Sequence, residues 1–176
     1  FIFLTLFLFG FSKSESYAVA TRHHLATDIG IEILEKGGNA VDAAVAVAFA
    51  LAVVNPSAGN LGGGGFMIIH NSSSKSIKAL DYREKAPIKS FETMFQDSEG
   101  NVIEGLSTNS ILASGIPGTV AGLFHALENY GTMDIKTLIE PSIELAKNGF
   151  PLSSFQSGNL NKYKKKFSRD NNAKII

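Results

Sequence analysis

The sequence contains no cysteine and no excess of charge of either sign. The absence of cysteine among its 176 residues excludes disulfide bonds, thiol nucleophiles and cysteine-based zinc sites. Sixteen basic residues balance sixteen acidic residues, so the net charge gives no reason to expect nucleic acid or an acidic membrane as a partner. Only 18% of the residues are charged, whereas 44% are hydrophobic. This composition is sufficient for the core of one ordinary domain.

The sequence also lacks an apolar segment long enough to cross a membrane, which needs roughly 20 residues. It opens with FIFLTLFLFGF, which is typical of the hydrophobic part of a signal peptide, and small residues follow at plausible cleavage positions. We therefore interpret residues 1–16 as the remnant of a signal peptide, cleaved near residue 16 or 18. Residues 17–176 are then expected to be exported to the periplasm or the cell exterior. Neither a methionine nor a basic segment precedes Phe1, which indicates a fragment of a longer protein.

Four consecutive glycines, residues 62–65, are unusual because each glycine costs conformational entropy on folding. A phosphate-binding loop would require G-x-G-x-x-G spacing or a lysine followed by serine or threonine, and neither is present here. The glycines instead precede FMIIH, an apolar run typical of a strand, so they do not open a helix toward an anion. We therefore expect a close-packed turn rather than a nucleotide site.

The distribution of apolar residues predicts an α/β organisation. Asn39 is expected to cap the helix that follows it, together with Asp42, and Pro141 is expected to break or kink a later helix. Residues 83–118 carry Gly, Ser and Pro at intervals, which indicates a loose surface segment. The expected strands are residues 18–24, 66–70 and 77–82, the last two as a hairpin, and the expected helices lie within residues 25–38, 40–54, 118–131 and 134–149.

The histidines and lysines do not indicate a metal site or a nucleic-acid site. His23 and His24 are adjacent, so on a strand their side chains would point to opposite faces. His70 and His125 lack a carboxylate or histidine partner at ligand spacing. The lysine run at residues 164–166 is more typical of a solvated helix face than of a nucleic-acid patch.

Arg83, in the segment DYREKAP, follows an expected strand and lies close to where the glycine loop could return. A guanidinium offers a planar fork of donors that matches a carboxylate, so an arginine held there suits recognition of an amino-acid-like substrate. Asp81 and Glu84 flank Arg83 and could instead pair with it in a surface ion network. From the residues alone, this second interpretation is favoured.

Three segments, read together, carry a resemblance to a known family. They are GGNAVDAAVAVAFALAVVNPSAGNLGGGGFMIIH, DYREKAP and ASGIPGTVAGLFHALENYGTM, in this order. Over residues from about Ala18 to about Phe155 the chain resembles the N-terminal part of the gamma-glutamyltranspeptidases, members of the N-terminal nucleophile hydrolase superfamily. The resemblance implies an α/β (α+β) fold, the N-terminal part of a four-layer αββα sandwich that is incomplete in this chain. It also implies self-cleavage of a precursor into a large and a small subunit, with residues 17–176 as the N-terminal part of the large subunit.

The resemblance implies that the full-length protein is a gamma-glutamyltransferase, or glutathione hydrolase. Such an enzyme takes the γ-glutamyl group from glutathione or another γ-glutamyl donor, holds it as a threonine ester and passes it to water, an amino acid or a peptide. No metal or organic cofactor is implied. The family's nucleophilic threonine and oxyanion donors lie downstream, so this chain is expected to hold no catalytic residue and to be inactive alone. None of its threonines is assigned a catalytic role, including Thr21, Thr108, Thr119 and Thr132.

The resemblance assigns a binding role to Arg83, which matches the family arginine that holds the α-carboxylate of the γ-glutamyl group. Glu84 matches the same motif, and whether it orients Arg83 or touches the substrate stays open. Two alternatives also stay open. One is a related amide acylase, of the cephalosporin or poly-γ-glutamate type, and the other is an inactive truncated product that only binds a partner. The balance of hydrolysis and transfer, the preferred acceptor and the oligomeric state are not determined by these residues.

Overall fold

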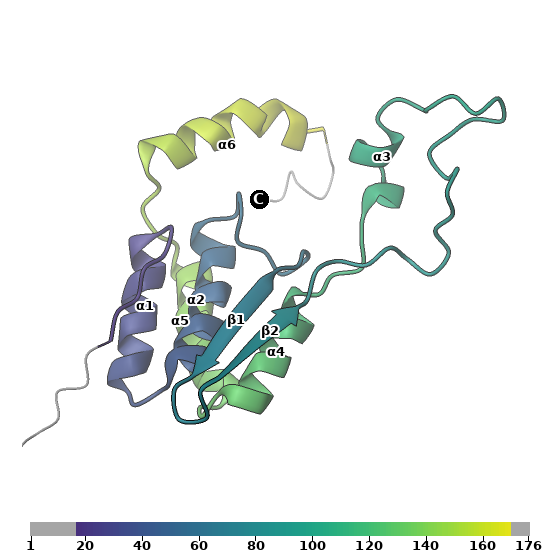
Figure 1. Ribbon diagram of the computed structural model, residues 1–176. Helices are drawn as coiled ribbons and strands as arrows, with labels where there is room; N and C mark the ends of the chain where they lie inside the picture. The colour runs from purple at the N-terminus through teal and green to yellow at the C-terminus, as the bar shows by residue number, and fades with distance from the viewer. Residues whose placement is uncertain (1–16, 170–176) are drawn as a thin grey trace, which may run out of the picture.

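The computed structural model describes residues 17–169, so the interpretation of residues 1–16 as a signal-peptide remnant lies outside the described part. The elements, in chain order, are α1 His24–Glu35, α2 Ala40–Val54, β1 Phe66–Asn71, β2 Ser76–Asp81, α3 Leu106–Asn109, a 3₁₀ turn Ile111–Ala113, α4 Thr119–Tyr130, α5 Ile135–Asn148 and α6 Ser154–Phe167. Figure 1 shows the two strands in front of the helices, with β2 beside α4, which it contacts. The segment between β2 and α4 extends away from the helices, as the loose composition of residues 83–118 predicts.

Helix α2 lies at the centre of the core and contacts α1, α4 and α5. It begins after Asn39 with a capping box, in which Asn39 Oδ1 accepts from the N–H groups of Val41 and Asp42 and the Asp42 carboxylate accepts from the Asn39 N–H. Both the range of this helix and its cap are confirmed. Its sequence is apolar on nearly every side, and a helix of that kind must be covered on several sides by other elements.

Asp42 is the one charged side chain in the described core, and it is fully buried. Its carboxylate accepts hydrogen bonds from the N–H and hydroxyl of Thr132, at 2.9 and 2.6 Å, and from the N–H groups of Asn39 and Met133. Burial alone would raise the pKa of Asp42, but the hydrogen bonds from Thr132, Asn39 and Met133 outweigh it and lower the pKa below its ordinary value. The carboxylate thus joins the start of α2 to the α4–α5 turn.

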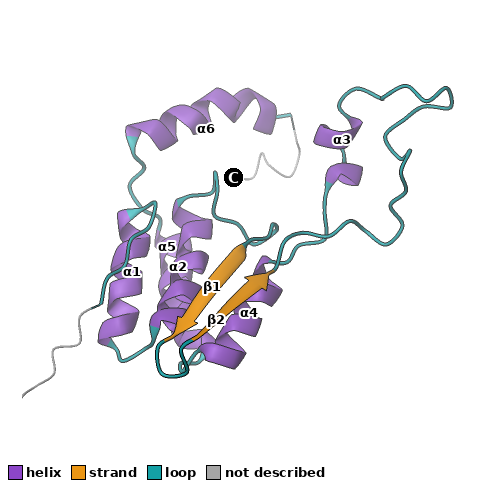
Figure 2. Ribbon diagram, viewed as in Figure 1, coloured by secondary structure: helices purple, strands orange, loops and turns teal. Residues whose placement is uncertain are grey.

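The two strands form an antiparallel hairpin, with Phe66 opposite Asp81 and Asn71 opposite Ser76 (Figure 2). The hairpin is confirmed in the expected segments. Alternate side chains of β1 face opposite sides. Met67 and Ile69 are half-buried against the core, whereas Phe66 and Ile68 are 65% and 77% exposed. One face of the hairpin is therefore packed on helices, and the other is bare within residues 17–169.

One expectation about local structure is wrong, and a second is decided in part. Residues 18–24 do not form a strand, because no neighbouring strand is available to pair with them in the described chain, and His23 instead caps α1 by accepting from the Leu25 N–H. Of the two alternatives for Pro141, a break is wrong, since α5 runs through it from Ile135 to Asn148, whereas a kink stays a prediction. A proline removes one hydrogen bond, whereas packing of Leu138, Ile139 and Leu145 holds α5 against the core.

Helix α6 is polar and carries the lysine run, residues 164–166, in its last turn with all three side chains exposed. A solvated helix face is therefore confirmed for this run. The helix is joined to the core through Gln156, whose side-chain amide donates to the carbonyl oxygen of Val54 at 2.6 Å.

Among the described residues, no helix combines the length and the apolar character that crossing a membrane requires.

Candidate functional site

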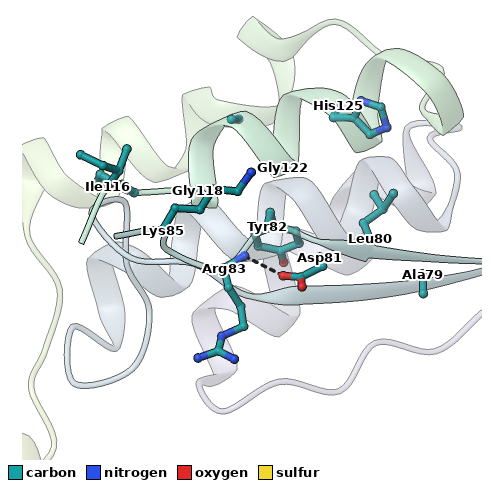
Figure 3. Close-up of a pocket in the computed structure, with 12 residues that line it drawn as sticks. Ala79, Leu80, Asp81, Tyr82, Arg83, Lys85, Ile116, Gly118, Gly122 and His125 are labelled. Carbon is teal, nitrogen blue, oxygen red and sulfur yellow. Dashed lines mark hydrogen bonds between the residues drawn. The ribbon is translucent and has the colours of Figure 1, made fainter. Parts of the chain in front are cut away.

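Three segments meet at the end of β2: the glycine loop, residues 60–65, the strand end, residues 81–85, and the entry to α4, residues 115–119. Figure 3 shows the strand end and the entry to α4. The Tyr82 N–H donates to the Gly65 carbonyl at 3.0 Å, which continues the hairpin ladder by one residue. On the other side, Lys85 and Ile116 exchange two backbone hydrogen bonds, at 3.1 and 2.8 Å. Arg83 therefore lies on a short extended segment that is held on both sides.

The glycines allow these segments to approach one another closely. A Cβ atom at Gly64 would lie 2.6 Å from the Cα of Arg83, and one at Gly118 would lie 2.9 Å from the Arg83 carbonyl oxygen. Both separations are shorter than real Cβ atoms show. None of the residues 62–65 has a positive φ. The glycine run is therefore used for close approach of backbones and not for left-handed conformations.

Tyr82 packs toward α4 and fixes which face of the strand Arg83 occupies. A Cβ at Gly122 would overlap the Tyr82 side chain, and a Cβ at Gly65 would lie 2.8 Å from its ring. The Tyr82 hydroxyl donates to the Phe66 carbonyl at 3.3 Å, and burial raises the pKa of this hydroxyl. Because successive side chains of an extended segment point to opposite sides, Arg83 is directed to the bare face of the hairpin.

The Arg83 side chain is exposed, and Figure 3 shows its guanidinium pointing away from Gly118, Gly122 and His125. Its Cζ lies 5.9 Å from the centroid of the Phe66 ring, within the range of a cation–π contact. Asp81 accepts from the backbone N–H of Arg83 at 3.0 Å and not from its guanidinium.

The surface ion network that the residues alone favour is not formed. The two ion pairs within residues 17–169 are Lys36–Glu32 and Lys147–Glu144, and neither involves Arg83, Asp81 or Glu84. Glu84 is exposed and lies beside Gly115, where an added Cβ would be 2.9 Å from the Glu84 Cβ. In the described chain the donors of the Arg83 guanidinium are therefore available to a ligand.

A hollow of about 560 Å³ lies between β2 and α4. Its lining includes Asp81, Tyr82, Arg83, Lys85, Ile116 and His125, although Figure 3 shows the Arg83 guanidinium pointing away from α4. This lining holds one carboxylate, that of Asp81, and therefore no carboxylate pair. Over the described part of the chain, no group of three or more His, Cys, Asp and Glu side chains could hold a metal ion.

The four histidines do not form one cluster. The rings of His23 and His24 stack at 4.8 Å at the start of α1, whereas His70 belongs to β1 and His125 to α4. Because His23 caps α1 and His24 is its first residue, the expected placement of this pair on opposite faces of a strand does not apply.

Sequence reasoning missed Asn60, which precedes the glycine run. Its side-chain oxygen accepts from the Gly63 N–H at 2.9 Å and from the hydroxyl of Thr119, a threonine to which the sequence assigned no role. The two residues are 59 positions apart, so no local pattern could indicate the contact. The available signal was an Asn that begins a Gly-rich turn, where its side chain commonly bonds to the backbone.

The family model, the curated relatives and the solved structures that match this chain carry related names. A family model described as Gamma-glutamyltranspeptidase matches residues 26–176. The chain is 48% identical over 157 residues to a glutathione hydrolase proenzyme of Pseudomonas sp. (strain A14), covering 89% of this chain and 27% of that protein. It is 49% identical over 151 residues to the glutathione hydrolase proenzyme of Escherichia coli (strain K12), covering 86% of this chain and 26% of that protein.

Among solved structures, the crystal structure of Helicobacter pylori gamma-glutamyltranspeptidase superposes with a TM-score of 0.87 at 46% sequence identity. The match covers 94% of this chain and 47% of that chain. The chain thus spans 26–27% of the length of these curated relatives, about a quarter.

Proposed function

Because this chain belongs to the gamma-glutamyltranspeptidase family, we propose that the full-length protein transfers γ-glutamyl groups and hydrolyses glutathione and related γ-glutamyl amides. The expected fold class is confirmed by the similarity to solved structures of this family, which covers nearly the whole chain and makes it part of an N-terminal nucleophile hydrolase fold. The relatives are named glutathione hydrolases, so a cephalosporin or poly-γ-glutamate acylase is not favoured.

In the proposed reaction, a threonine hydroxyl outside this chain attacks the γ-carbonyl of the donor and its own amine accepts the proton. That proton passes to the leaving amine as the γ-amide C–N bond breaks, so the amine departs and a γ-glutamyl ester remains. Water, or the amine of an amino acid or peptide, then attacks the ester, the ester C–O bond breaks with return of a proton to the threonine oxygen, and glutamate or a new γ-glutamyl amide is released. The proposal requires no metal or organic cofactor. The described residues contribute to binding: a group that fixes the α-carboxylate also restricts the γ-carbonyl, because the two belong to one short glutamyl chain.

The observation that carries this proposal is the geometry at Arg83. Its backbone is clamped between Gly64 and Gly118, its guanidinium lies on the bare face of the hairpin, and its donors have no hydrogen-bond or ion-pair partner within residues 17–169. A planar fork of free donors on a fixed backbone matches a carboxylate in two-point geometry. Glu84 is included in the proposed site through its place in the same motif.

The test is Arg83→Ala in the full-length enzyme, with glutathione and γ-glutamyl-p-nitroanilide as donors. Losing one partner of a desolvated charge pair costs about 2–5 kcal/mol, so kcat/KM should fall by roughly 30-fold to several thousand-fold. Arg83→Lys should restore only part of the loss, because an ammonium cannot reproduce the fork. Glu84→Gln, measured in parallel, separates a contribution of its charge from that of Arg83.

The matched control is Arg22→Ala, which removes another exposed arginine, in the segment that precedes α1. It should leave kcat/KM unchanged. If Arg83→Ala folds and retains wild-type kcat/KM, the role in carboxylate binding is wrong.

We further propose that residues outside this chain cover the bare face of the hairpin, including the small subunit from the same precursor. Phe66, Ile68 and Ile77 expose 65%, 77% and 68% of their surface on this face. A contiguous apolar surface of this kind is unusual on a complete soluble protein. The name proenzyme, carried by the relatives of Pseudomonas and Escherichia coli, supports a precursor that is processed.

We also propose export to the periplasm or the cell exterior, with residues 1–16 removed as a signal peptide. The support is the composition of that segment, which has the apolar character and length of a signal peptide and is followed by small residues. N-terminal sequencing of the protein recovered from the periplasm or the medium should find a mature chain that begins near residue 17 or 19. Recovery of the uncleaved segment in the membrane fraction would contradict this proposal.

A further inference from the structure

A group of hydrogen bonds joins the glycine loop to the first turn of α4. Asn60 Oδ1 accepts from the Gly63 N–H and from the Thr119 hydroxyl. The Gly63 carbonyl in turn accepts from the N–H groups of Gly118 and Thr119, at 2.8 and 3.0 Å. The first N–H groups of a helix have no partner within the helix, and the residue preceding α4 is a glycine that supplies no side-chain cap. The loop therefore caps the helix.

Thr119 is 5% exposed, so its hydroxyl is withdrawn from water and depends on Asn60 for an acceptor. The same Asn60 oxygen fixes the turn of the loop through Gly63. Removing the Asn60 side chain leaves the buried Thr119 hydroxyl without its acceptor. Removing the Thr119 hydroxyl leaves Asn60 bonded to Gly63 alone, so the side-chain bond between the loop and the helix is lost in both cases.

This link lies next to the backbone of Arg83. Gly64 touches Arg83 from the side of the loop, and Gly118 touches it from the side of α4. The spacing between these two glycines is set by the hydrogen bonds of Asn60, Gly63 and Thr119. The guanidinium itself has no hydrogen bond to the described residues, so its position depends mainly on the backbone that carries it.

We propose that Asn60 and Thr119 are positioning residues for Arg83: by locking the glycine loop to the start of α4, they hold the strand end where the guanidinium can meet the α-carboxylate of the donor. This inference depends on the proposed function of Arg83. Two-point pairing of a guanidinium and a carboxylate is sensitive to displacement, since both hydrogen bonds must form at once. A small shift of the strand end therefore weakens donor binding more than the chemical step that follows it.

The test uses the full-length enzyme and separates KM from kcat with γ-glutamyl-p-nitroanilide as donor. Asn60→Ala and Thr119→Val each remove one side of the link, and each should raise KM roughly 5- to 50-fold with a smaller change in kcat. Thr119→Ser keeps the hydroxyl and should restore a KM close to that of the wild type.

Asn71→Ala is the matched control. Its side-chain oxygen accepts from the N–H of Ser74, three residues on, as Asn60 accepts from Gly63, but at the far end of the hairpin. It should leave the KM unchanged, which shows that loss of such a turn bond is not sufficient to raise the KM.

A double-mutant cycle distinguishes positioning of Arg83 from general stabilisation. Asn60→Ala should raise the KM in the wild type but not further in Arg83→Ala, because the guanidinium through which it acts is then absent. If Asn60→Ala raises the KM equally in the wild type and in Arg83→Ala, this inference alone is overturned. It is also overturned if Asn60→Ala and Thr119→Val lower the melting temperature but leave the KM unchanged. An unchanged kcat/KM in a folded Arg83→Ala overturns the proposed role of Arg83 in carboxylate binding as well. If Asn60→Ala does not yield a processed enzyme, Thr119→Val carries the cycle.

Discussion

Substitution of Gly64 by alanine tests whether the glycine run places Arg83. The Cα of Gly64 faces the backbone of the strand end, whereas Gly62, two residues earlier, faces open space. Neither residue has a positive φ, so an alanine at either position is compatible with the backbone dihedral angles. The two substitutions therefore form a matched pair within one loop.

The size of the expected loss of activity follows from the contacts that an added Cβ would make at Gly64. An added Cβ would lie 2.6 Å from Arg83 Cα and 2.7 Å from the backbone nitrogen of Glu84, whereas ordinary van der Waals contact begins at 3.4 Å. The strand end must therefore withdraw by about 0.8 Å, because backbone atoms cannot rotate away as a side chain can. Misplacing a positioning group by about 1 Å costs on the order of 100-fold in rate. We expect kcat/KM to fall roughly 10- to 100-fold.

The assay compares Gly64→Ala, Gly62→Ala and the wild type as full-length processed enzymes, with γ-glutamyl-p-nitroanilide as donor. Overpacking at Gly64 should also lower the free energy of unfolding by about 1–3 kcal/mol, measured by urea denaturation. Gly62→Ala, which has nothing within 4 Å of the added atom, should match the wild type in both measurements. Equal kcat/KM for all three proteins would refute the argument that close backbone approach fixes Arg83.

Two further predictions concern the buried carboxylate and the isolated chain. Asp42→Asn should lower the free energy of unfolding at pH 7 by about 1–3 kcal/mol, because an amide NH₂ replaces an acceptor facing buried donors, while the exposed cap variant Asp134→Asn should lower it less. Since the folded-state pKa of Asp42 is lowered, its contribution is complete above the ordinary carboxyl pKa, about 4, and is lost as pH falls through the folded value. Urea denaturation between pH 7 and pH 3 should therefore show a free energy of unfolding that falls less with acid in Asp42→Asn than in the wild type. An equal fall in both proteins would contradict the lowered pKa of Asp42. Residues 17–176 expressed alone should release no p-nitroaniline from γ-glutamyl-p-nitroanilide and should aggregate in light scattering, because the face that includes Ile68 stays bare; turnover by the purified chain would show that one of its own threonines is the nucleophile.

The sequence alone determined the elements whose signals are local. The range of α2 follows from an unbroken apolar segment that begins after Asn39, and the cap follows because its partners are two and three residues away. The hairpin follows from two short runs of strand-type residues, 66–70 and 77–82, on either side of a polar turn. The resemblance of the motifs around residues 62–65 and Arg83 also indicated the family before any contact was known.

Tertiary structure decided the features that depend on residues far apart in the chain. Residues 18–24 have the composition of a strand but form none, because a strand requires a partner and the sequence cannot say whether one lies beside it. Asp42 accepts hydrogen bonds from Thr132, which lies 90 positions away in the sequence, and Asn60 accepts one from Thr119, which lies 59 positions away. The glycine run could be recognised from composition, but its use could not, since close approach depends on which backbone arrives opposite it. For the same reason, the sequence placed Arg83 at a strand end, but only the packing of three separate segments around it decided that its guanidinium forms no ion pair with Asp81 or Glu84.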